Sequence, residues 1–253
     1  MDHKSQPAHL RKTSLDLFII LLTSLASIAY FLRSNPERLL VFDDSYITLR
    51  FAENFLRYKC ITYDGSAFLS GATSPLHIVC IALLGLLMKM EEASLAIGVI
   101  FFILSSIIVY LWILALYGRR HAALLAGMMM ATSGWLVFDA LNGMETTAFI
   151  FFSLLTFYLF DRYEGKPIYT IPLFLSVLTR PEGWFIAVSL WMWQLIRYYI
   201  NRDRPVLKRL AAAAGIFFVR TGKQQAIPKA SGLVNKGYAA FSKEDCFGKS
   251  SAG

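Results

Sequence analysis

Long apolar runs separated by short clusters of basic residues dominate this chain. The first run, Leu15–Leu32, has roughly 18 mostly apolar residues, enough for a helix to span about 30 Å of hydrocarbon. Hydrophobic residues make up 56% of the sequence, more than a soluble domain normally carries. The pattern therefore predicts an all-α, polytopic membrane protein, with spans at 15–32, 95–117, 122–138, 147–160, 168–179 and 184–196.

The basic clusters predict which side of the membrane each loop faces. Basic residues precede the first run, so residues 1–14 are expected to form a cytoplasmic N-terminus, although a cleaved signal peptide is the alternative. The apolar run 76–88 has only about 13 residues, short for a crossing. If it crossed, the later basic clusters would all lie outside, which the positive-inside rule disfavours. We therefore expect a juxtamembrane or re-entrant helix within a first outer loop at 33–94.

The C-terminal part of the chain changes character. The apolar run 210–219 is too short to cross reliably and is only a possible seventh span. Residues 220–253 are rich in Lys, Gly, Ser and Gln and contain no apolar run. The sequence thus predicts a transmembrane catalytic-type module at 15–219, followed by a polar, flexible tail.

Two adjacent carboxylates, Asp43 and Asp44, follow the first apolar run. From Ile47 on, apolar and polar residues alternate with helical spacing, which predicts an amphipathic helix lying on the membrane surface. Asp44 or Ser45 can cap the first turn of this helix, whose dipole favours a carboxylate there. Asp43 is then free to face a substrate or a metal ion. In the alternative interpretation, both acids only cap the helix and contact solvent.

Two short loops are predicted on the same outer side as these acids. One contains Asn142 and Glu145, and the other contains Arg180 and Glu182. Charges at the mouths of apolar hairpins are costly unless solvated or paired, so our hypothesis is one shared site. A guanidinium is suited to bidentate phosphate contact, and Arg180 lies where a lipid phosphate is expected. In the alternative interpretation, the loops are plain turns and His77 is a packed or solvated imidazole.

Charge and cysteine content exclude some functions. The net charge is +8, but the basic residues sit between apolar runs, where they encode topology, so no nucleic-acid partner is expected. The 3 cysteines have no paired-ligand spacing and are odd in number. They therefore indicate neither a zinc site nor a full disulfide framework.

Four ordered motifs resemble those of the bacterial GT-C membrane glycosyltransferases. That group includes the mycobacterial arabinofuranosyltransferase-like enzymes and, more distantly, the protein O-mannosyltransferases. The motifs follow a first span and are FDDSYITLRFAEN at 42–54, GATSPL at 71–76, NGMET at 142–146 and TRPEG at 179–183. The resemblance implies a GT-C-type helical bundle with juxtamembrane helices in its long first outer loop.

The resemblance also implies a reaction and roles for residues. A sugar would move from a polyprenyl-phosphate carrier to a glycan, lipid or protein acceptor, on the extracytoplasmic face of a bacterial inner membrane. Asp43 would be the catalytic carboxylate, and Asp44 a helper or a ligand of a divalent metal ion, Mg or Mn. The residues expected to bind substrate are His77, Asn142, Glu145, Arg180 and Glu182.

Three alternatives to a complete enzyme are also considered. Relatives of this kind continue through further spans, whereas this hydrophobic pattern ends near Val219, so the chain is expected to be the N-terminal half of such an enzyme. A non-catalytic truncated membrane protein is one rival. A solute transporter or lipid flippase is another, but it would need polar residues near mid-bilayer and broken helices. Apart from Pro172, the predicted spans offer few such features.

Overall fold

The chain folds into helices. The computed structural model describes residues 6–35, 40, 43–59, 61–63, 73–163, 166–201 and 215, and these residues form no strand. The all-α prediction is therefore confirmed for this part of the chain. The elements are α1 (Gln6–Ser34), α2 (Asp43–Tyr58), α3 (Pro75–Leu84), α4 (Met90–Tyr117), α5 (Arg120–Ala131), α6 (Gly134–Ala140), α7 (Thr146–Arg162), the 3₁₀ turn η1 (Pro167–Tyr169), α8 (Thr170–Thr179) and α9 (Gly183–Asn201).

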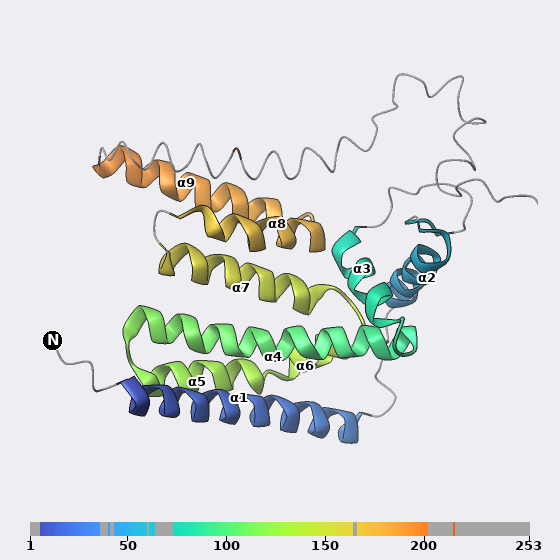
Figure 1. The fold of residues 1–253 in the computed structure, drawn as a ribbon, viewed down its shortest axis with the longest axis horizontal. Helices are drawn as coiled ribbons and strands as arrows, with labels where there is room; N and C mark the ends of the chain where they lie inside the picture. Colours follow the sequence, from blue (N-terminus) through green and yellow to red (C-terminus); the bar gives the residue numbers. More distant parts are fainter. Residues whose placement is uncertain are drawn as a thin grey trace, which may run out of the picture.

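The longer helices lie side by side as a bundle (Figure 1). α4 lies in the middle and packs against α5 and α7, while α1 covers α5, and α8 lies between α7 and α9. α4, the bent pair of α5 and α6, α7, α8 and α9 run in alternating directions along the bundle (Figure 1). α2 and α3 lie beyond the end of the bundle at which α4 begins (Figure 1).

In the part of the chain that the structure describes, two helices are long and apolar enough to cross a membrane. They are the segment Thr13–Ser34 of α1 and the whole of α4. α5 and α6 pass the same test only as a pair, and they are bent by 55° relative to each other. The helices are therefore compatible with a membrane protein, while the bundle of six spans stays a prediction. The possible span at 210–219 and the tail at 220–253 lie outside the described residues, except for residue 215.

The segment 122–138, predicted as one span, forms the bent pair α5 and α6, which is long and apolar enough to cross a membrane only if both helices form one broken span. The span at 122–138 therefore stays a prediction. The break falls at Thr132 and Ser133. The Thr132 hydroxyl donates to the Met128 carbonyl at 2.9 Å, a local bond that competes with the helix ladder. Ser133 has an extended backbone and precedes the first residue of α6. The segment 76–88 gives only the ten-residue helix α3, about 15 Å long and too short to cross.

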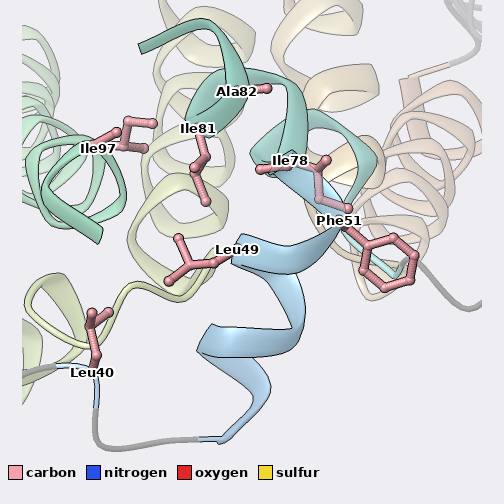
Figure 2. Packing of buried hydrophobic residues seen from close by; sticks show 9 residues of the cluster. Leu40, Leu49, Phe51, Ile78, Ile81, Ala82 and Ile97 are labelled. Carbon is pink, nitrogen blue, oxygen red and sulfur yellow. The ribbon is translucent and has the colours of Figure 1, made fainter. Parts of the chain in front are cut away.

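α2 and α3 are held to the bundle by an apolar cluster (Figure 2). Leu49 and Phe51 of α2 pack with Ile78 and Ile81 of α3, and Ile97 of α4 completes the contact. These side chains are at most 6% exposed. Burial of each such side chain is worth about 1.5–3 kcal/mol, so the amphipathic face of α2 has a protein partner.

An ion pair between a buried aspartate and a partly exposed arginine joins three helices toward the other end of α4. Asp16 of α1 is fully buried and accepts two hydrogen bonds of 2.7 Å from Arg120 of α5. Tyr110 of α4 donates a third, at 2.9 Å. Tyr110 and Ser94 are sixteen residues apart on α4, about 24 Å along its axis. The ion pair is thus remote from α2 and α3.

Replacing Gly98 by Ala is expected to destabilise the fold by about 1–3 kcal/mol, because it overpacks the contact between α4 and α6. A Cβ atom at Gly98 would overlap the backbone carbonyl oxygen of Ala140, which no side-chain rotation can move. Thermal unfolding in detergent measures the loss. Gly134→Ala is the matched control, since nothing lies within 4 Å of a Cβ there. Equal losses in the two variants would contradict the close approach.

Candidate functional site

The segment 141–145 between α6 and α7, here called the Asn-Gly turn, is the centre of the candidate site. Gly143 has φ +72°, the left-handed region that glycine adopts without strain. A Cβ at this position would also collide with the Ser94 hydroxyl and with Leu40. The Leu40 N–H donates to the Leu141 carbonyl at 3.2 Å. An Asn-Gly pair therefore suits both the conformation and the space available.

Three helices donate hydrogen bonds to two consecutive carbonyls of this turn. The Ser45 hydroxyl of α2 donates to the Asn142 carbonyl. The Ser94 hydroxyl of α4 donates to the Gly143 carbonyl at 2.9 Å, and His77 Nε2 of α3 lies 3.2 Å from the same oxygen. Ser45 of the acidic motif and His77, which directly follows the Ser-Pro-Leu motif, thus meet at the Asn-Gly motif, although they are far apart in sequence.

The Arg-Pro motif joins them through an ion pair. Arg180 Nε donates to Glu145 Oε1 at 2.9 Å, and the Arg180 side chain keeps 31% of its surface exposed. Asp139 also lies close enough to Arg180 for electrostatic attraction. Arg180 has an extended backbone, as expected for a residue before proline. Its two Nη groups form no hydrogen bond with the described residues, so they remain available to a ligand.

The remaining predicted residues lie around this centre. α2 begins at Asp43, so Asp44 and Ser45 are inside its first turn and do not precede it. Ser45 binds the Asn-Gly turn and does not cap its own helix. Asp43, Asp44 and Glu182 are exposed, and their carboxylates form no hydrogen bond or ion pair within the described residues. Their predicted roles stay predictions.

His77 and Asn142 are buried, each only 1% exposed. His77 Nδ1 has no hydrogen-bond partner among the described residues. Burial lowers the pKa of His77 from its ordinary value of 6.5, while the Gly143 carbonyl and the Glu145 charge oppose this shift. The imidazole is therefore neutral at pH 7.

The geometry gives no support to the expected divalent metal ion. Within the described part of the chain, no three His, Cys, Asp or Glu side chains group together as a metal site. Asp44 has only Asp43 as an acidic neighbour in sequence. Mg and Mn sites draw mainly on oxygen ligands, and two exposed carboxylates alone do not define one. The metal prediction stays untested, and no reaction step is derived from it.

Sequence reasoning missed two residues that build the site. Ser45 lies inside a predicted motif, but its hydroxyl was expected to serve its own helix. Ser94 was only the last residue of the predicted outer loop. Both hydroxyls bind carbonyls distant in sequence, and no local pattern signals such a partner.

Comparisons with known proteins do not identify a family for this chain. No family model, no curated protein and no solved structure matches it. Any assignment of function therefore depends on the motifs and on the geometry described above.

Proposed function

We propose that this chain is, or is part of, a membrane glycosyltransferase that uses a polyprenyl-phosphate sugar as donor. One observation carries the proposal: side chains from three motifs of the resemblance meet at the Asn-Gly turn, and His77, which directly follows the fourth motif, contacts the same turn. The three motif side chains are Ser45, Glu145 and Arg180. If these residues only formed turns and helix caps, their motifs would not have to lie close together. A shared site, in contrast, requires the motifs to be neighbours in the fold.

The proposed reaction transfers the sugar in one displacement. The acceptor hydroxyl oxygen bonds to the anomeric carbon while the bond from that carbon to the phosphate oxygen breaks. The electron pair leaves with the prenyl phosphate, and the acceptor proton passes to the Asp43 carboxylate, which acts as general base. Exposure of Asp43 at the start of α2 leaves it accessible to an acceptor.

Arg180 suits the departing phosphate. Glu145 holds only the Nε of the guanidinium, which fixes the orientation of the plane and leaves both Nη groups free of bonds to described residues. A preorganised cation stabilises charge that develops on a leaving group. Arg180 accordingly binds the donor phosphate, and Glu145 orients Arg180.

The arrangement of charges supports an extracytoplasmic site. Arg119, between α4 and α5, and Arg162, at the end of α7, lie at the end of the bundle away from α2 and α3 (Figure 1). Basic residues at helix ends favour the cytoplasmic side, and this supports an outer position for the Asn-Gly turn. The proposed partners are the lipid bilayer, the prenyl-linked donor, and a glycan, lipid or protein acceptor, in a bacterial inner membrane.

Reconstitution tests the proposal. The purified chain in liposomes is given a panel of prenyl-phosphate sugars together with candidate acceptors, and released prenyl phosphate is measured. Release above that of protein-free liposomes, with at least one sugar, is the expected result. If no donor is cleaved while the protein remains folded, the glycosyltransferase proposal is wrong for this chain.

A lipid transporter or flippase is the second candidate, because the structure contains features that such proteins use. α5 and α6 form a helix pair bent by 55°, and Asp16 is a buried carboxylate in an apolar helix. In the same liposomes, a flippase would move a labelled prenyl-phosphate sugar across the bilayer without cleaving it. A non-catalytic truncated protein would do neither.

A further inference from the structure

We propose that His77 is a positioning residue, which fixes the Asn-Gly turn through a hydrogen bond to its backbone, and that it is not a ligand of the substrate. Its imidazole donates a hydrogen bond from Nε2 to the Gly143 carbonyl and thereby sets the turn that carries Glu145, the partner of Arg180. The inference depends on the proposed function only for what the positioned residues do.

The hydrogen-bond chemistry fixes the state of the ring. A backbone carbonyl can only accept, so at 3.2 Å Nε2 must carry the proton. Nδ1 is then unprotonated, and it is buried without a partner among the described residues. A second proton would place a charge in a site that is 1% exposed. The structure therefore requires the neutral Nε2–H tautomer.

Burial and occupancy argue against contact between His77 and substrate. Nε2 is already occupied by the Gly143 carbonyl, and the ring has almost no accessible surface. Substrate can reach the Arg180 side chain, which is 31% exposed, but it cannot reach the buried imidazole of His77. The influence of His77 must therefore pass through the backbone.

The connection to the proposed site is short. Gly143 is two residues before Glu145, and the Glu145 carboxylate orients Arg180. Ser94 donates to the same Gly143 oxygen, so loss of His77 leaves one donor in place. The expected effect is consequently partial. It should appear mainly in donor binding, where Arg180 acts.

A fall in pH is expected to lower the stability of the folded chain through His77. The pKa of His77 in the folded chain is below 6.5, so the unfolded chain binds the proton more tightly. The neutral ring is fully compatible with the fold above about pH 6.5, and stability falls as the pH drops below that value. The Glu145 carboxylate is the charged group of the described residues around α3 that interacts with His77. Its negative charge raises the pKa of His77 and so partly opposes the lowering by burial.

Two variants of the full-length chain test the inference. His77→Gln keeps an N–H donor near the position of Nε2, whereas His77→Met fills the space without a donor. We expect His77→Met to raise the KM for the donor by about 3- to 10-fold, the worth of one hydrogen bond, with a smaller change in kcat. His77→Gln should stay within about 3-fold of the wild type and lose the acid sensitivity below pH 6.5.

A spectroscopic readout is independent of activity. Nitrogen NMR of histidine-labelled protein at pH 7 should show a neutral Nε2–H imidazole that is missing from the His77→Gln spectrum. If the wild type cleaves no donor, the proposed function fails, while this signal and the acid sensitivity of unfolding still decide the inference. An Nδ1–H or charged ring, or a His77→Met variant that matches the wild type in unfolding between pH 5 and 8, would overturn it.

Discussion

Replacing Arg120 by Met is expected to lower the unfolding midpoint of the protein in detergent by roughly 10 °C. Asp16 is fully buried, and Arg120 supplies two of its hydrogen bonds, each 2.7 Å long. Without Arg120, the hydrogen bond that the Asp16 carboxylate keeps with the described residues is the one from the Tyr110 hydroxyl, at 2.9 Å. A buried charge that loses its partner destabilises far more than the intact pair stabilises. Circular dichroism during heating measures the change.

Two further variants separate this mechanism from a general effect of losing charge. Arg119→Met removes a neighbouring arginine that is exposed, and it should leave the midpoint nearly unchanged. Combining Arg120→Met with Asp16→Leu removes both charges and should recover most of the lost stability. If Arg119→Met is as damaging as Arg120→Met, the buried pair is not the cause.

The helices could largely be predicted from the sequence, because apolar composition and length determine them. The predicted span 95–117 corresponds to α4, which begins earlier, at Met90, since Glu91 and Glu92 favour the first turn. The predicted span 168–179 corresponds to η1 and α8. The bend before Gly134 was missed, although Thr-Ser-Gly is a signal for a break.

The candidate site could be predicted only as a set of motifs, and not as a set of contacts. The Asn-Gly turn and the Arg-Pro turn were recognisable from local residue preferences. Their partners are fixed by tertiary packing, since Arg180 binds a carboxylate 35 residues earlier and Ser45 binds a carbonyl 97 residues later. The pairing of Asp16 with Arg120 likewise has no local signal in the sequence, because the two residues are 104 positions apart.

Replacing Asp43 by Asn is expected to reduce sugar transfer by about 10²- to 10⁴-fold, the usual contribution of a general base. Asp43 starts α2, two residues before Ser45, whose hydroxyl binds the Asn-Gly turn, and the Asp43 side chain is exposed to an acceptor. Asn has nearly the same shape but cannot accept the acceptor proton. The rate of prenyl phosphate release in liposomes, at saturating donor, measures the effect.

Because Asp43 is exposed, its replacement should reduce catalysis without unfolding the chain. A loss of activity in this variant would therefore not be explained by a loss of stability. Glu53→Gln is the matched control: Glu53 is an exposed acid on the same helix, its Oε2 lies 3.3 Å from Arg50 Nη1, and it lies nearly three turns further along. It should leave the rate of transfer within about 2-fold of the wild type, as expected for a surface pair.

Asp44→Asn tests the neighbouring acid. If it loses as much activity as Asp43→Asn, Asp43 and Asp44 act together as the general base. Wild-type turnover in Asp43→Asn would exclude Asp43 as the general base and would leave this role to another acid, such as the exposed Asp44 or Glu182.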